Sequence, residues 1–207
     1  MSNFNYVEAS LKSIAKRKLV CGVGINDSDT AISNVIDGRL SFCPFYKVWH
    51  SMIVRCYSPK NQKSNPAYKG CSVSCEWLTF SNFKSWMSNQ EWQGMELDKD
   101  ILIQGNKTYS AKACIFVTKS INSLLCSKPK GKNLQGVSYY KITGRFRAQC
   151  KHNGVNKCVG YYATPEDAHE AYKEFKYGII KEVAMTQAEP LKSALLSYKI
   201  NATVSSS

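Results

Sequence analysis

The strongest constraint on the fold of this chain is the 49-residue run from Gly136 to Ala184. Three segments rich in Val, Tyr, Phe and Ile are separated by the short breaks Thr143-Gly144 and His152-Asn153-Gly154. Glycine supplies the positive φ that tight hairpins require. We therefore expect a three-stranded meander with strands at Gly136–Ile142, Arg145–Lys151 and Val155–Tyr162.

An amphipathic helix is expected after the third strand. Thr164 suits the N-cap and Pro165 the first helical position, and Glu166 and Asp167 in the first turn meet the positive end of the helix dipole. We expect an apolar stripe of this helix to cover one face of the sheet. The stripe consists of Ala168, Ala171, Tyr172, Phe175, Ile179 and Val183.

The other face of the sheet would then be free to contact a partner. Side chains alternate along a strand, so Phe146, Ala148 and Cys150 point to one side of the middle strand. The opposite side carries cations and an amide at steps of about 6.5–7 Å. These residues are Arg145, Arg147, Gln149 and Lys151. Arg bridges guanine bidentately and Gln reads adenine, so the row predicts contact with phosphates and base edges.

This stretch resembles the plant APETALA/ethylene-response-factor DNA-binding domain and its relatives in phage homing endonucleases. The resemblance is carried by Gly136-Val137, Gly144-Arg145-Phe146-Arg147-Ala148, Val159-Gly160-Tyr161-Tyr162, Thr164-Pro165-Glu166-Asp167-Ala168 and Ala171-Tyr172. It implies a three-stranded sheet in the DNA major groove. The implied contacts are Tyr139, Lys141, Arg145, Arg147 and Gln149, with Lys151 and Lys157 on phosphate. A basic module that binds RNA or a protein stays open as an alternative.

The net charge of +13 is unevenly distributed. From Ile101 to Pro165 the chain has eleven Lys and Arg residues and neither Asp nor Glu. Such a block neutralises phosphates and releases counterions, which predicts a salt-sensitive affinity for nucleic acid. The alternative is a solvated basic surface that serves solubility.

Bulk composition indicates a folded, soluble chain. With 207 residues and 43% apolar residues, it can build a genuine core in one large domain or two small ones. It contains no run of 18 apolar residues, and its start lacks the pattern of a signal peptide. Nine Cys without paired spacing indicate reduced thiols. We expect a cytoplasmic protein, in the host cell if phage-encoded, with no membrane partner.

Two aromatic helices are predicted in the first half of the chain. Their stripes are Tyr46, Trp49, Met52, Ile53 and Cys56, then Trp77, Phe80, Phe83 and Trp86. The segment Cys71–Cys75 between them reads as a short strand, whose two Cys are better explained as core thiols than as zinc ligands. Arg55 is either a phosphate contact or an ordinary surface charge. Leu11–Lys18 reads as a short basic helix or an arm on the phosphate backbone.

The span from Tyr46 to Leu125 resembles phage-encoded HNH-type endonucleases, in which a ββα-metal module clasps one divalent cation. The resemblance implies Asp98 as a metal ligand, Asn106 as the mid-loop residue and Asn122 as the helix ligand, with Mg²⁺ or Mn²⁺ bound. Lys99 stands where the family has its general-base His, and an ammonium of pKa about 10.4 cannot accept a proton from water at neutral pH. Asp98 and Asp100 remain candidate metal ligands, and one of them or a metal-bound hydroxide a candidate base. A degenerate HNH scaffold kept for DNA binding or packing is the alternative.

The sequence therefore predicts an α+β protein of two modules. The expected parts are an N-terminal extension (1–45), an HNH-like module (46–126), a basic linker (127–133), an APETALA/ERF-type domain (134–186) and a C-terminal extension (187–207), with a short helix at Leu191–Tyr198. The favoured function is double-stranded DNA binding by a phage or mobile-element protein related to homing endonucleases. An active metal-dependent endonuclease and an inhibitory or protein-binding module are the other hypotheses.

Overall fold

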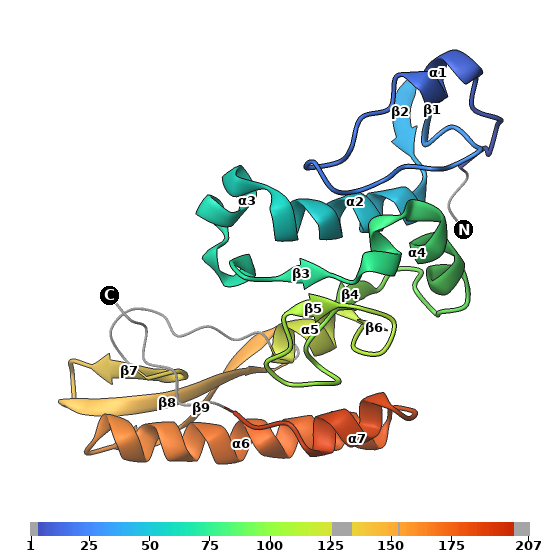
Figure 1. The fold of residues 1–207 in the computed structure, drawn as a ribbon. Coiled ribbons are helices and arrows are strands. Elements are labelled where there is room, and N and C mark those ends of the chain that lie inside the picture. The colour runs from blue at the N-terminus through green and yellow to red at the C-terminus, as the bar shows by residue number, and fades with distance from the viewer. Residues whose placement is uncertain (1–3, 126–133, 153, 201–207) are drawn as a thin grey trace. The chain divides into compact units, whose positions relative to one another are not determined.

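The computed structural model describes residues 4–125, 134–152 and 154–200. The chain divides into two compact units, 1–116 and 117–207, and each is described by itself (Figure 1). Helices and strands are mixed along the chain, which confirms the predicted α+β class. The division falls before the predicted linker (127–133), all of which lies outside the described residues. Asn122, expected in the first module, therefore belongs to the second unit.

The first unit combines short helices with three pairs of short strands. Its helices are α1 (Leu11–Ala15), α2 (Pro44–Tyr57), α3 (Pro59–Ser64) and α4 (Phe80–Ser88), with 3₁₀ turns at Pro66–Tyr68 and Cys75–Leu78. Its strands are β1 (Ser33–Ile36), β2 (Arg39–Phe42), β3 (Ser72–Val73), β4 (Glu96–Asp98), β5 (Thr108–Tyr109) and β6 (Ile115–Val117), which crosses the boundary. β1 pairs with β2, β3 with β5 and β4 with β6.

Both predicted aromatic helices form, as α2 and as a 3₁₀ turn that leads into α4. Their stripes meet in one core, where Trp49 and Phe83 are fully buried. The indole N–H of Trp49 donates to the Trp77 carbonyl at 2.7 Å, so this fully buried donor has its hydrogen-bond partner.

The N-terminal segment packs onto this core, whereas the sequence predicted an extension. Phe4 is buried in the cluster, and the amide of Ile25 donates to the Leu78 carbonyl at 2.7 Å. The β1–β2 hairpin was not predicted. Its turn residues Asp37 and Gly38 have φ values of +51° and +73°, the left-handed pair that a tight hairpin turn uses.

The second unit is a three-stranded antiparallel sheet with one long helix (Figure 1). It contains α5 (Lys119–Leu125), β7 (Val137–Tyr140), β8 (Arg145–His152), β9 (Val155–Tyr162), α6 (Pro165–Met185) and α7 (Leu191–Leu196). The strands run in the order β7-β8-β9, which confirms the predicted meander, and α7 confirms the predicted short helix. Gly144 and Gly154 have φ values of +63° and +80° at the hairpin turns.

α6 begins and packs as its sequence predicts. The Thr164 hydroxyl accepts the Asp167 amide at 3.1 Å, and Pro165 is the first helical residue. Ala168, Tyr172 and Ile179 pack on Ala148 and Cys150 of the sheet. Gly136 completes this contact, because a Cβ there would lie 2.2 Å from the Tyr172 ring.

A second stripe of α6, which the sequence analysis did not list, contacts α7. Ile180 and Ala184 are fully buried on α6, as is Leu195 on α7. Lys176 is also almost completely buried, and its ammonium donates to the Tyr172 hydroxyl at 3.1 Å. Among the described helices, none has the length and apolar character needed to span a membrane.

Candidate nucleic-acid interface

The register of the sheet determines which side chains lie on the face that α6 leaves uncovered. Ala148 is fully buried in the core beneath α6 and pairs with Val137. Alternation from this rung puts nine side chains on the opposite face, called here the outer face. They are Ser138 and Tyr140 of β7, Arg145, Arg147, Gln149 and Lys151 of β8, and Asn156, Cys158 and Tyr161 of β9.

The row predicted on β8 lies on the outer face. Arg145 and Lys151 are exposed, whereas Arg147 and Gln149 are half-buried. A strand rises about 3.3–3.4 Å per residue, so the row extends over about 20 Å. A linear array of this length can contact several nucleotides.

Three other predicted contacts lie elsewhere. Tyr139 pairs with Phe146, their ring centroids are 5.3 Å apart, and both are on the side of the sheet that faces α6. Lys157 pairs with Cys150 and lies on that side too. Lys141 is in the turn after β7, which ends at Tyr140. The expected outer-face position of Tyr139 is wrong because Val137, two residues earlier, faces the core.

Tyr140 and Tyr161 are outer-face residues that the sequence analysis missed as contacts. Their ring centroids are 5.2 Å apart, and the guanidinium carbon of Arg147 lies 5.8 Å from the Tyr140 centroid. Counting alternate positions from Val137 would have found Tyr140. The position of Tyr161 on the outer face depends on the β8–β9 register, which a bulge shifts between Ala148 and Gln149 and which the sequence does not reveal.

One rung crosses all three strands of the outer face, through Ser138, Arg147 and Tyr161. The Ser138 hydroxyl oxygen and the Arg147 Nε are buried and have no hydrogen-bond partner within the described part of the chain. The Tyr140 ring restricts the Arg147 side chain, so less conformational freedom is lost when its guanidinium meets a ligand.

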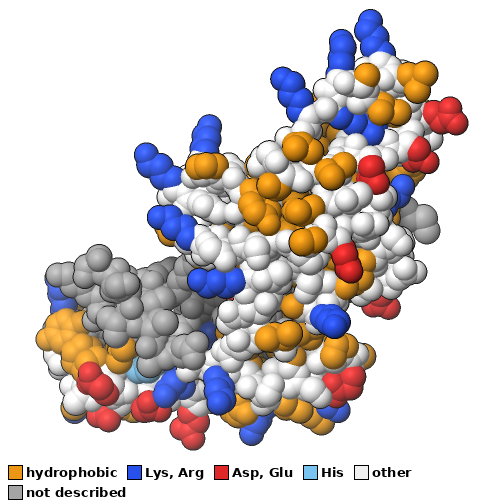
Figure 2. Space-filling model, in the orientation of Figure 1, with side chains coloured by type: hydrophobic (Ala, Val, Ile, Leu, Met, Phe, Trp, Pro, Cys, Tyr) orange, Lys and Arg blue, Asp and Glu red, His pale blue; other side chains and the backbone are white. Residues whose placement is uncertain are grey.

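Charge is segregated within the second unit. The unit carries fourteen of the 28 Lys and Arg residues but six of the 15 Asp and Glu residues. All six acids come after Pro165, as Glu166, Asp167, Glu170, Glu174, Glu182 and Glu189. The acidic side chains lie along α6 at the lower edge of Figure 2, and the five on α6 are all exposed. The sheet itself has no carboxylate, so an anion at the outer face meets no repulsive side chain there.

Two of the residues for which the HNH resemblance implied chemistry lie between β4 and β5: Asp98 ends β4 and Asn106 lies in the loop that follows. One Asp98 carboxylate oxygen accepts the amides of Asp100 and Ile101 at 2.8 and 2.9 Å. The Asn106 side-chain amide donates to the carbonyls of Lys99 and Thr108 at 2.6 and 2.7 Å. These bonds hold the two ends of the loop together.

Lys99 closes the same loop. Its ammonium donates to the Asn106 carbonyl at 3.1 Å and lies 3.3 Å from the Asp100 carboxylate. Burial, and next the charge of Asp100, raise the pKa of the Asp98 carboxyl to about 6. Asp98 is therefore a buried residue at the end of β4, and its ionisation near neutral pH lowers the stability of the folded state.

These residues fit a divalent metal poorly. One Asp98 oxygen is engaged by two amides, Asp100 pairs with Lys99, and the Asn106 amide group serves the loop. Nowhere in residues 4–125, 134–152 and 154–200 do three His, Cys, Asp or Glu side chains gather to hold a metal ion. Asn122, the implied helix ligand, lies on α5 of the second unit.

Two further candidates from the sequence have structural roles. Arg55 lies over the Tyr68 ring, 5.6 Å from its centroid, and is half-buried beside Tyr109. This contact fits neither an extended phosphate contact nor an ordinary surface charge. Cys71 is buried in the core, whereas Cys75 is exposed.

Comparisons of the chain with protein-family models, with curated proteins and with solved structures find no match.

Proposed function

We propose that this chain binds double-stranded DNA through the outer face of its three-stranded sheet. The observation that carries the proposal is the row Arg145, Arg147, Gln149 and Lys151 on a face that α6 leaves uncovered. The described carboxylates of this unit lie on or after α6, so the charge distribution favours an anionic partner on the sheet. This arrangement supports the resemblance to the APETALA/ERF domain.

The side chains of the row differ in whether neighbouring residues hold them in place, and we expect them to differ in role. Arg147 is held beside Tyr140 and suits a bidentate contact with a base edge. Arg145 and Lys151 are exposed at the two ends of the row and suit phosphates. Phosphate contacts supply affinity and base contacts supply specificity. Substitution of Arg147 should therefore lower specificity, whereas substitution of Arg145 or Lys151 should lower affinity for all sequences.

An HNH-related origin of the first unit, and with it a phage or mobile-element source, is the second part of the proposal. One observation favours it: Asn106 donates to the carbonyl of residue 99, where the family has its general base. The mid-loop residue thus orders the loop as the HNH resemblance implies. Because Lys99 and the engaged Asp98 fit metal chemistry poorly, we favour DNA binding over cleavage.

The test measures fluorescence anisotropy of labelled duplex DNA, with a sequence selected from a random pool and a scrambled control. Arg147→Ala should weaken binding to the selected duplex by about 5- to 150-fold, the range for a lost base contact. Lys157→Ala removes the same charge from the other side of the sheet and should change affinity less than about threefold. Equal effects of the two variants would refute the outer face as the binding surface.

A plasmid assay tests the endonuclease alternative. Supercoiled DNA is incubated with the protein in Mg²⁺, Mn²⁺ or EDTA. Retarded but intact DNA in every condition is the result that the loop geometry predicts. Nicked product that requires metal and disappears in Asp98→Ala would establish cleavage instead. The protein-binding alternative would be favoured if this chain selectively captured one protein and did not bind DNA.

A further inference from the structure

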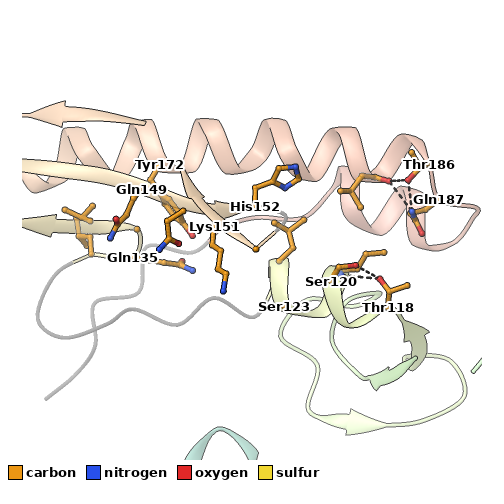
Figure 3. Close-up of a pocket in the computed structure, with 18 residues that line it drawn as sticks. Thr118, Ser120, Ser123, Gln135, Gln149, Lys151, His152, Tyr172, Thr186 and Gln187 are labelled. Carbon is orange, nitrogen blue, oxygen red and sulfur yellow. Dashed lines mark hydrogen bonds between the residues drawn. The ribbon is translucent and has the colours of Figure 1, made fainter. Parts of the chain in front are cut away.

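A cavity of about 790 Å³ opens in the second unit beside the sheet (Figure 3). Its walls come from α5, from β8 and the β8–β9 hairpin, and from the last turn of α6. Ser120 and Ser123 line it from α5, and Thr186 and Gln187 line it from the residues that directly follow α6. In Figure 3 the Lys151 side chain extends from β8 away from α6.

The chemistry of the lining favours an anionic oxygen ligand. Among the 18 described residues that line it there is no Asp or Glu, and the Lys among them is Lys151. Hydroxyls and carboxamides make up most of the polar lining, and such groups can donate hydrogen bonds. They belong to Thr118, Ser120, Ser123, Gln135, Gln149, Asn156, Tyr172, Thr186 and Gln187. The Thr186 hydroxyl and the Gln187 side-chain amide already donate to the Val183 carbonyl, so the donors for a ligand come from the other side chains. A phosphate suits such a lining, whereas a cation meets the ammonium of Lys151.

The cavity is continuous with the outer face. Gln149 and Lys151 belong to both, because they end the β8 row and also line the cavity. From Arg145 to Lys151 the row covers about 20 Å, or about six base-pair rises of 3.4 Å. The groove turns around the duplex every 10–10.5 base pairs, so a nearly straight strand cannot follow it that far. When Arg147 contacts bases, the Lys151 end must lie over the backbone.

We propose that this cavity binds a backbone phosphate of the duplex, with Lys151 as counter-charge and the α5 hydroxyls as donors. The inference rests on the proposed DNA binding and adds a second element, α5, to the interface. A phosphodiester and free inorganic phosphate share this chemistry, and separate experiments distinguish them.

The test places a negative charge in the cavity without altering the sheet. Ser123 is exposed on α5, and Ser123→Asp adds a carboxylate to the cavity wall, whereas Ser123→Asn adds similar bulk without charge. Ser193→Asp, at an exposed position of α7, lowers the net charge equally, outside the cavity. Like charges close together are strongly unfavourable, so Ser123→Asp should weaken duplex binding by about tenfold.

The loss in Ser123→Asp should be the same for the selected and the scrambled duplex, because phosphates carry no sequence information. Ser123→Asn and Ser193→Asp should each stay within about threefold of the wild type. Equal losses in Ser123→Asp and Ser193→Asp would overturn the cavity proposal and leave the outer face standing. A loss confined to the selected duplex would also overturn it.

Titration of inorganic phosphate, followed by amide chemical shifts, separates the two phosphate sources. One outcome would assign the cavity to free phosphate. In it, inorganic phosphate shifts the amide signals of Ser123 and Lys151 in the wild type, the Lys151 signal does not shift in Ser123→Asp, and the protein does not bind duplex DNA. That result would overturn both the proposed function and the backbone site. Duplex binding together with weak phosphate shifts at these residues supports the backbone site.

Discussion

The outer face of the sheet and the loop from Asp98 to Thr108 differ in what their polar groups are doing. Both were assigned functional residues by resemblance to DNA-acting families. On the outer face Arg145 and Lys151 are exposed, and the Arg147 Nε has no hydrogen-bond partner among the residues that the structure describes. In the loop, Asp98 and Asn106 make hydrogen bonds to the loop backbone. A residue in a motif position can bind a partner only if its polar groups are not already engaged.

The largest effect expected from this contrast is on stability. Asn106→Ala removes the two donated bonds to the carbonyls of Lys99 and Thr108 and leaves both carbonyls without that donor. The free energy of unfolding should fall by about 2–4 kcal/mol in urea denaturation. Asn89→Ala, which removes one exposed bond to Ser85, is the control and should cost less than about 1 kcal/mol. If folded Asn106→Ala bound DNA more weakly, the loop would contribute to binding as well as the outer face, and the two regions would not differ in this way.

The next effect is on sequence discrimination. Tyr140→Leu removes the ring beside the Arg147 guanidinium and should reduce the difference in binding free energy between the selected and the scrambled duplex by about 1–2 kcal/mol. In a double-mutant cycle with Arg147→Ala the losses should be non-additive, because both variants disable the same contact. Additive losses would mean that Tyr140 contacts DNA without positioning Arg147.

Asp98 should give an effect of similar size on the free energy of unfolding, and this effect depends on pH. Its folded-state pKa, about 6, is raised above the usual 3.8, so the folded state binds the proton more tightly. This group's stabilising contribution is present below pH 4 and is lost as pH rises through about 6. Asp98→Asn keeps an acceptor oxygen for the two amides but cannot titrate.

The wild-type stability should therefore fall relative to Asp98→Asn by about 1–2 kcal/mol between pH 4 and 7. Urea denaturation at several pH values measures this difference. Parallel curves for the two proteins would show that the Asp98 carboxyl titrates normally.

The smallest expected effect is at Tyr139, a predicted contact that lies with Phe146 on the side of the sheet facing α6. Tyr139→Leu should leave affinity for the selected duplex within about twofold, since the side chain points away from the proposed interface. A tenfold loss in anisotropy titrations would move the interface toward the β7–β8 turn.

Local signals predicted the second unit well. Gly144, Gly154 and Thr164 act within a few residues of the chain, so the hairpins and the start of α6 could be read directly. The Asp37-Gly38 pair is an equally local signal for the β1–β2 hairpin, although this hairpin was not predicted. Lysine is seldom buried, so the burial of Lys176 on the core side of α6 could not be expected from the sequence.

The functional residues depended on non-local geometry. Tyr161 joins the outer face only through the register of β9 with β8, including the bulge near Gly160. Asp98 and Asn106 were predicted by position, but their hydrogen bonds depend on the path of the loop. Residue spacing therefore identified the row on β8 and could not tell which polar groups were free to bind.

The salt dependence of duplex binding tests the central claim most directly. Each phosphate contact contributes about 0.9 to the slope of log K against log salt concentration. If Arg145 and Lys151 contact phosphates, the variant that combines Arg145→Ala with Lys151→Ala should lose about two units of slope relative to the wild type. An unchanged slope in that variant, with wild-type duplex affinity, would contradict DNA binding through the outer face.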